Sequence, residues 1–276
     1  MTDFPVTTST DPQSPVPEAQ TPRRTGAMRT IAALILREMS TRYGRTPGGY
    51  AWALLEPLGM IVILSFGFSL LLRSPSLGTS FLLFYATGFL PFNLYQGVSL
   101  NTSRALTYSR PLLAYPAVTW IDAVLARFLL TVLTAVTVAA VLMVGILSII
   151  DARVVIQLGP ILGAMGLGAV FGLGVGVLNC LLTGLFPTWA IVWSIITRPL
   201  FIVSGVIYIY EDLPRAAQNV IWYNPLIHIT AMMRSGFYPM YEPDWVSPEF
   251  VVFSALIPMA AGLLLLRRHY KDILNA

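Results

Sequence analysis

Apolar residues occur in six long runs separated by short polar segments. The runs cover about residues 50–72, 81–100, 124–149, 155–182, 188–210 and 250–266. A helix needs roughly 20 apolar residues to cross about 30 Å of hydrocarbon, so the runs have the length of membrane spans. The last run is short, but Arg267 and Arg268 at its end can reach the lipid headgroups. The pattern predicts an all-α integral membrane protein with six transmembrane helices.

A second pattern precedes the first run. Within residues 28–43, one set of apolar side chains recurs at helical spacing, namely Met28, Ile31, Ala32, Ile35, Met39 and Tyr43. This spacing predicts an amphipathic helix that lies in the membrane interface. Pro47, Gly48 and Gly49 then break the helix and are predicted to form a hinge into the first span. A passive membrane anchor is the alternative interpretation.

Two further segments lie outside the spans. Residues 211–249 hold a moderately apolar run between Val220 and Met233, together with Trp222 and Trp245. We expect amphipathic or re-entrant helices on the outer face, and a surface loop with aromatic anchors is the alternative. Residues 1–27 are rich in Pro, Thr and Ser and lack the apolar core of a signal peptide, so we expect a disordered cytoplasmic tail.

Composition and charge agree with a membrane protein. Hydrophobic residues make up 56% of the chain and charged residues 11%, whereas soluble domains carry about 25% charged residues. Basic residues gather on one predicted side, namely Arg23, Arg24, Arg29, Arg37, Arg42, Arg45, Arg104, Arg110, Arg267, Arg268 and Lys271. The positive-inside rule therefore places both termini in the cytoplasm. Topology accounts for the net charge of +4, so no nucleic-acid partner is indicated.

Enzymatic motifs are missing from the sequence. The only lysine is Lys271, so no GxxxxGK[ST] phosphate-binding loop exists, and ATP would have to be hydrolysed by another chain. His228 and His269 have no neighbours at metal-ligand spacing, and neither GxSxG nor HExxH occurs. The lone Cys180 excludes an intrachain disulfide. We therefore predict no catalytic residues, no metal site and no cofactor in this chain.

Cationic residues on the cytoplasmic side are candidates for contact with a soluble partner. Arg37 and Arg42 lie on the predicted interface helix, while Arg104, Tyr108 and Arg110 lie in the loop between the second and third spans. A short cationic loop can dock into a cleft of a partner protein. It can equally reflect the positive-inside rule alone.

The spans carry candidates for a substrate path. The second span has an aromatic face formed by Phe81, Phe84, Tyr85, Phe89, Phe92 and Tyr95. Aromatic faces stack on sugar rings and allow them to slide, although such a face can equally contact lipid or the protein core. Tyr208 and Tyr210 at the outer end of the fifth span are assigned to the same path.

Arg198 lies near the middle of the fifth span. A charge there costs about 2.5–3.5 kcal/mol on insertion scales and normally faces protein or water. Arg198 could attract an anionic substrate or could pair with Glu56 or Asp122.

The fourth span contains small residues spaced four apart, namely Ala164, Gly168, Gly172 and Gly176. Such spacing allows close helix packing, either within the subunit or at a dimer seam.

Residues 37–58 resemble the start of ABC-2 type transporter permeases, specifically the capsular polysaccharide export permeases of Gram-negative bacteria. The matching residues are Arg37-Glu38, Arg42-Tyr43, Arg45-Thr46, Gly49, Trp52 and Glu56-Pro57-Leu58. The stretch Trp222-Tyr-Asn-Pro-Leu226 looks like the outer-face loop of the same family. The resemblance covers about residues 28–276, and the Pro-rich tail departs from the compact family pattern.

The resemblance implies an inner-membrane homodimer with two copies of a cytoplasmic ABC ATPase, which binds ATP and Mg. A lipid-linked, usually acidic polysaccharide would pass between the subunits towards a periplasmic co-polymerase and an outer-membrane channel. Residues 28–43 would be the interface helix, residues 101–111 the coupling helix, and residues 211–245 the helices that close the exit.

Three alternatives stay open at this point. An O-antigen or teichoic-acid export permease has the same architecture, and Arg198 favours an acidic capsule over it. A membrane-embedded transferase acting on lipid carriers would use carboxylates at one depth, for which Glu56 and Asp122 are available. A passive channel would need no partner protein.

Overall fold

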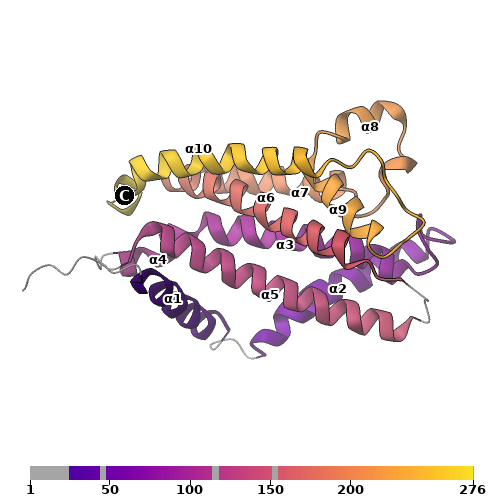
Figure 1. Cartoon of the computed structure of the whole chain (residues 1–276), viewed down its shortest axis with the longest axis horizontal. Helices are drawn as coiled ribbons and strands as arrows, with labels where there is room; N and C mark the ends of the chain where they lie inside the picture. Colours follow the sequence, from indigo (N-terminus) through magenta and orange to yellow (C-terminus); the bar gives the residue numbers. More distant parts are fainter. Residues whose placement is uncertain (1–24, 44–47, 114–117, 151–154, 276) are drawn as a thin grey trace, which may run out of the picture.

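The computed structural model describes residues 25–43, 48–113, 118–150 and 155–275, and all regular structure in these ranges is helical. Six helices run along the long axis of the molecule (Figure 1): α2 (Tyr50–Ser69), α3 (Phe81–Ser103), α5 (Trp120–Ile149), α6 (Leu158–Leu185), α7 (Trp189–Val203) and α10 (Pro248–Asn275). The predicted all-α class is confirmed. The predicted tail, residues 1–27, lies outside the described residues except for its last three.

Within the described ranges, four helices are long and apolar enough to cross a membrane by themselves. They are α2, α5, α6 and α10. The chain is therefore a multi-pass membrane protein. α3 is long but carries Asn93, Gln96 and Asn101, and the 15 residues of α7 span only about 22 Å.

The fifth predicted span, residues 188–210, is helical only as far as Val203. Gly205 then adopts φ +70°, a left-handed conformation that suits glycine, and residues 204–209 form a non-helical turn that continues past Gly88 towards Phe84 and Tyr85 of α3. The 3-10 turn η1 (Tyr210–Asp212) follows. An apolar run continues across this break, so hydrophobicity alone did not reveal where the helix ends.

Two other helices have boundaries that differ from the apolar runs. α5 begins at Trp120 because Thr119 and Asp122 form a reciprocal capping box. α10 continues past residue 266 to Asn275, so Arg267, Arg268 and Lys271 are helical. The runs marked only the apolar part of each helix.

The predicted helices of the outer loop are present. α8 (Arg215–Ile221) and α9 (Pro225–Ser235) lie between α7 and α10. Asn224 caps α9 by accepting a hydrogen bond from the Leu226 amide, and Pro225 occupies the first helical position, where its missing N–H costs nothing. α9 packs against α6 and α3, and most of its side chains are buried.

The small residues of α6 pack within the subunit, against α3. A Cβ added to Gly172 would lie 2.9 Å from the carbonyl oxygen of Tyr95, and one added to Gly176 would lie 2.7 Å from Cβ of Thr102. Only glycine allows this approach, so the intrasubunit interpretation of the spacing is confirmed. α3 is thereby held in the centre of the bundle.

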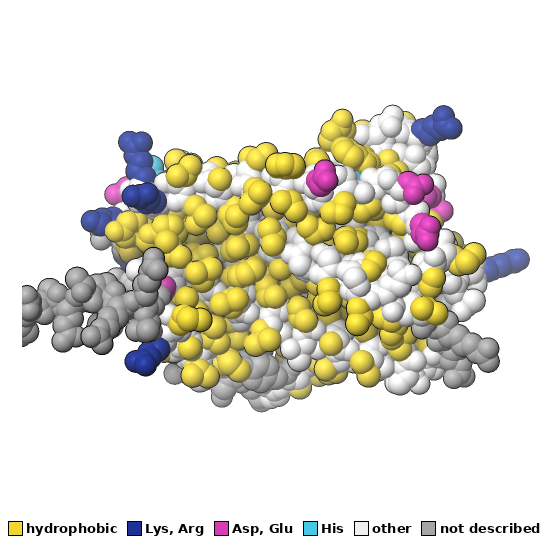
Figure 2. Space-filling view, in the orientation of Figure 1, with side chains coloured by type: hydrophobic (Ala, Val, Ile, Leu, Met, Phe, Trp, Pro, Cys, Tyr) yellow, Lys and Arg dark blue, Asp and Glu magenta, His cyan; other side chains and the backbone are white. Residues whose placement is uncertain are grey.

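The two ends of the bundle differ in charge. α1 (Thr25–Tyr43), α4 (Ala105–Leu113) and the C-terminus of α10 lie at one end, on the left in Figure 1, whereas α8 and α9 lie at the other. Most visible Lys and Arg side chains gather at the left end, and an apolar belt covers the middle (Figure 2). This distribution is the one that the positive-inside rule describes.

Candidate functional site

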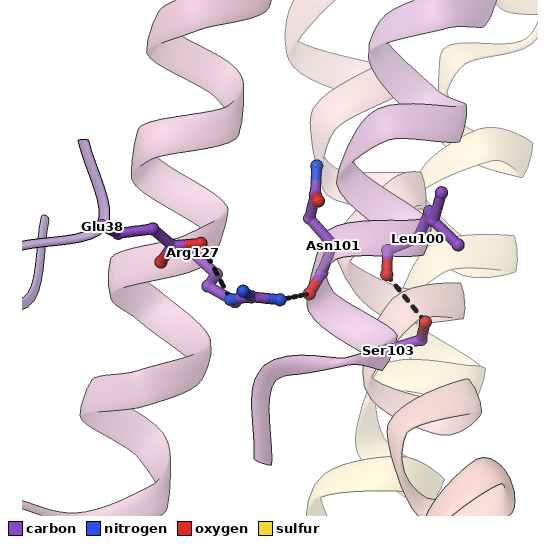
Figure 3. A network of polar contacts seen from close by, with 5 residues as sticks. All are labelled: Glu38, Leu100, Asn101, Ser103 and Arg127. Atoms are coloured by element: carbon purple, nitrogen blue, oxygen red, sulfur yellow. Dashed lines mark hydrogen bonds and ion pairs between the residues drawn. The ribbon is translucent and has the colours of Figure 1, made fainter. Parts of the chain in front are cut away.

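Arg127 on α5 contacts three other helices, α1, α3 and α4, at the charged end of the bundle (Figure 3). Its Nε atom lies 2.9 Å from Oε1 of Glu38 on α1, and Nη1 donates a 3.1 Å hydrogen bond to the carbonyl oxygen of Asn101 on α3. The guanidinium carbon also lies 4.1 Å from the centre of the Tyr108 ring on α4. We call Glu38, Asn101, Tyr108 and Arg127 the junction. It connects α1, α3, α4 and α5 through one cation.

The ion pair of the junction is shielded from water. The side chains of Arg127 and Glu38 are 7% and 10% exposed. A buried ion pair contributes little net stability, but removing one partner leaves an uncompensated charge and costs about 3–5 kcal/mol. Because of that penalty, α1 is held at a fixed place against α5.

α4 is anchored beside the junction by apolar packing. Ala105 and Leu106 are buried with Val124 of α5 and Cys180 of α6. Pro111 lies inside α4.

The residues predicted to contact a partner lie around the junction. Arg37, Arg104, Tyr108 and Arg110 are exposed. The side chain of Arg42 lies outside the described part of the chain. Arg104 sits between α3 and α4 and faces a cavity, so it is not part of the short helix itself.

Glu38 and Arg127 form the ion pair of the junction, and the sequence analysis assigned a functional role to neither residue. A signal was present for Arg127, which is a lone charge inside the apolar run of residues 124–149. A charge in such a run is a functional hypothesis by default. Glu38 carried no comparable signal because it belongs to a segment rich in polar residues.

The predicted aromatic path on α3 is largely buried in the protein. Tyr85, Phe89 and Phe92 are at most 7% exposed, and only Phe81 is half-buried. Phe92 packs on Phe201 of α7 with ring centres 5.4 Å apart. In this conformation these three side chains fill the core because α3 is the central helix, which is the core interpretation of the aromatic face, and their place in a substrate path stays a prediction.

Arg198 is exposed on α7 and lines a cavity of about 330 Å³ between α3, α6 and α7. It pairs with neither predicted carboxylate. Asp122 accepts hydrogen bonds from Thr119, and Glu56 lines a separate cavity of about 540 Å³ between α2, α3 and α5. The alternative of a structural ion pair for Arg198 was therefore wrong.

A second arginine organises the opposite end of the molecule. Arg234 on α9 is 1% exposed and donates hydrogen bonds of 2.7 Å to the carbonyl of Tyr208 and 3.0 Å to that of Val206. Burial lowers the pKa of Arg234 to about 10, so it keeps its charge at neutral pH. Arg234 thereby fixes the non-helical segment, residues 204–209, that follows α7.

The two tyrosines of the predicted path lie in or next to this non-helical segment. Tyr210 stacks on Trp245 with ring centres 4.1 Å apart, and its hydroxyl donates to the carbonyl of Gln218. Tyr208 is half-buried. Both keep some accessible surface near the outer end of α7.

The predicted hinge is partly described. Gly48 and Gly49 have φ values of +93° and +41° just before α2, and a Cβ on Gly48 would strike the Trp52 ring at 2.9 Å. This turn therefore requires glycine. Pro47 lies outside the described residues. No group of three or more metal-binding side chains occurs in the ranges that the structure describes.

Comparisons with known proteins identify a family and several relatives by sequence. Residues 29–238 match the family described as ABC-2 type transporter. The chain is 27% identical over 247 residues to the polysialic acid transport protein KpsM of Escherichia coli, covering 90% of this chain and 96% of that protein. It is 28% identical over 249 residues to the capsule polysaccharide export inner-membrane protein BexB of Haemophilus influenzae, covering 89% and 92%. It is 26% identical over 245 residues to the protein CtrC of Neisseria meningitidis, which has the same description as BexB, with coverage of 89% and 92%.

Proposed function

Since the chain belongs to the ABC-2 type transporter family, we propose that it is the permease subunit of an ATP-driven exporter of lipid-linked acidic capsular polysaccharide. The membrane would be the bacterial inner membrane. The observation that carries this proposal is the match to KpsM, BexB and CtrC over about nine-tenths of the chain, since all three are named for capsule or polysialic acid transport.

The proposed topology has six spans with both termini in the cytoplasm. In this arrangement α3 crosses the membrane despite its polar side chains because neighbouring helices cover it. α7 is too short to cross alone, and residues 204–209 with α9 fill the remaining distance to the outer face. The end with α1 and α4 is cytoplasmic because it carries most of the basic residues. The chain acts as a homodimer above two copies of a cytoplasmic ATPase, which supplies the ATP and Mg sites.

In the proposed mechanism, the junction transmits force. ATP binding closes the ATPase dimer, which presses on α4 through Tyr108 and Arg110 and on α1 through Arg37 and Arg42. Because Arg127 contacts α1, α3 and α4 at once, motion of either short helix reaches α5. The hinge at Gly48 and Gly49 lets α1 move relative to α2.

The proposed glycan path runs between the subunits, beside α2 and α7. These two helices leave most of their side chains exposed in the single chain, as expected of a surface that meets a partner. Arg198, Tyr208, Tyr210 and the accessible part of Phe81 would contact the glycan. Transport requires different affinities in two conformations, so these contacts must be weak. A periplasmic co-polymerase and an outer-membrane channel would receive the product.

The structure weakens the transferase alternative. Of its two carboxylates, Asp122 is engaged in the capping box of α5 and lies in a different place from the cavity of Glu56. An O-antigen or teichoic-acid permease has no support from the names of the three relatives. A passive channel is not supported by the family match, which is to ABC-2 type transporters.

Co-purification tests the proposal directly. The affinity-tagged chain, expressed with its native operon, should retain a P-loop ATPase in equal amount, and ATPase activity should rise with acidic lipid-linked polysaccharide. A permease that purifies alone yet still exports polysaccharide contradicts the proposal. Stimulation by neutral glycans in preference to acidic ones would contradict the assignment to acidic capsule.

A further inference from the structure

The cavity between α3, α6 and α7 is cationic. Arg104 and Arg198 line it, and none of its lining residues is a carboxylate. Neither arginine has an ion-pair partner within the described ranges. Its volume of about 330 Å³ falls in the range of about 300–1,000 Å³ that small-molecule sites occupy.

Two buried polar groups in the same cavity lack hydrogen-bond partners. The indole nitrogen of Trp189 donates a 2.8 Å hydrogen bond to Oδ1 of Asn179, and because indole can only donate, the amide nitrogen is the atom left over. Nδ2 of Asn179 and Oγ of Ser99 have no partner among the described residues, although both residues are 3% exposed. Unpartnered buried polar groups are rare and costly, so these atoms indicate a ligand.

The charged and unpartnered buried groups in the cavity are donors, whereas Gln96, Tyr95 and Thr183, which also line it, can both donate and accept. Two guanidinium groups and one amide NH₂ can only donate, and the Ser99 hydroxyl can donate as well. By contrast, Ser103, Ser194 and Thr197 already donate to carbonyls of their own helices. Such a set requires an anion with several acceptor oxygens, and arginine pairs suit phosphate in particular.

The surroundings of the cavity indicate how the anion is attached. Ile191 and Ile195 on the same helix as Arg198 are 64% and 61% exposed, so acyl chains can lie next to the site. A soluble phosphate would gain nothing from this surface, whereas a lipid would bury it.

We propose that this cavity binds the phosphate-ester headgroup of an anionic lipid. Arg104 and Arg198 hold the phosphate oxygens, and Asn179 and Ser99 donate further hydrogen bonds. Only the identity of the physiological lipid rests on the proposed function. That lipid would be the anchor of the exported polysaccharide.

Native mass spectrometry of the full chain in detergent tests the site with phosphatidylglycerol as the probe. We expect phosphatidylglycerol to bind, and phosphatidylcholine and soluble glycerol 3-phosphate each to bind at least about tenfold more weakly. Arg198→Gln and Asn179→Leu should each weaken phosphatidylglycerol binding by about tenfold or more. This is the loss of affinity expected when one hydrogen bond to a charged phosphate is removed. Arg73→Gln, an exposed arginine at the opposite end, is the matched control and should bind as the wild type does.

The outcomes separate the site from the proposed function. Equal affinity of wild type and Arg198→Gln for phosphatidylglycerol, or equal binding of phosphatidylcholine, overturns the site. Equally tight binding of glycerol 3-phosphate overturns the assignment to a lipid. Arg198 is exposed, so this variant stays folded even if Asn179→Leu does not. A chain that binds phosphatidylglycerol through Arg198 but exports no polysaccharide contradicts the proposed function and retains the site.

Discussion

The Nε atom of Arg127 lies 2.9 Å from Oε1 of Glu38, and this buried ion pair joins α1 to α5 at the charged end of the bundle. The same guanidinium donates to α3 and covers Tyr108 of α4. Any displacement of α1 or α4 must therefore move Arg127 or break its contacts. This relationship is the structural basis for treating the two short helices as one mechanical unit.

Neutralising both members of this pair should cost less than the sum of the two single neutralisations. Arg127→Gln and Glu38→Gln should each destabilise the chain by about 3–5 kcal/mol, because each leaves an unpaired buried charge. The double variant should be less destabilised than the sum of the two. Thermal unfolding of the four proteins in detergent measures the coupling. Additive effects would show that the two side chains do not interact in solution.

The same variants test the mechanical role. In membranes that also contain the ATPase, the double variant should fold and bind ATPase but lose the coupling between ATP hydrolysis and export. Arg215→Gln on the exposed α8 is a suitable control, since it changes charge far from the junction. Wild-type coupling in the folded double variant would contradict force transmission through Arg127.

Gly172 should not tolerate a side chain. A Cβ at this position would lie 2.9 Å from both the Tyr95 carbonyl oxygen and Cβ of Val98, so Gly172→Ala should cost about 1–3 kcal/mol through overpacking. Gly166 on the same helix has no such neighbour within 4 Å. Gly166→Ala should therefore be neutral or slightly stabilising, and equal melting temperatures for the two variants would count against the α3–α6 packing.

Arg234 should be irreplaceable by lysine. Its two terminal nitrogens each hold a different backbone carbonyl, and hydrogen bonds of charged groups contribute about 1.5–3 kcal/mol each. Lysine presents a single point of charge and cannot reproduce this fork. Arg234→Lys and Arg234→Gln should both lower the melting temperature, with Arg215→Gln as the exposed control. A wild-type melting temperature for Arg234→Lys would contradict the prediction.

His228 should make the stability of the outer end depend on pH. The Ser247 amide donates to Nδ1, so Nε2 carries the proton and donates 2.8 Å to the Trp222 carbonyl. Burial lowers the pKa of His228. The unfolded chain therefore takes up a proton near pH 6.5 while the folded chain does not, and stability is lost as the pH falls below that value, by at most about 1.4 kcal/mol per pH unit.

Melting temperatures between pH 7.5 and pH 5 measure this effect. Wild type should lose more stability on acidification than His228→Gln, which cannot titrate. His269→Gln on α10 is the matched control and should follow the wild-type slope. Identical slopes for wild type and His228→Gln would show that this histidine does not titrate differently in the folded chain.

The sequence predicted most of the fold because membrane helices are specified by apolar length. The helix that ends at Tyr43, the helices between α7 and α10, and the close packing of Gly172 and Gly176 against α3 all follow from local patterns. The end of α7 did not, because Gly205 turns the chain inside an apolar run that continues. The start of α5 was missed because a capping box, and not hydrophobicity, determines it.

The site was harder to predict for a physical reason. Contacts such as Glu38 to Arg127 join residues 89 positions apart, and no local periodicity encodes them. The aromatic face of α3 illustrates the converse, since a stripe at helical spacing does not reveal whether it meets a ligand or the core. Arg198 was recognised because one charge in an apolar span is informative by itself.

The measurement that tests the central claim most directly is ATP-driven polysaccharide transport into proteoliposomes. The chain should move no polysaccharide when reconstituted alone, whatever nucleotide is supplied, and should move acidic lipid-linked polysaccharide once its ATPase is added. Sustained transport fuelled by ATP in vesicles that contain only this chain would contradict the account.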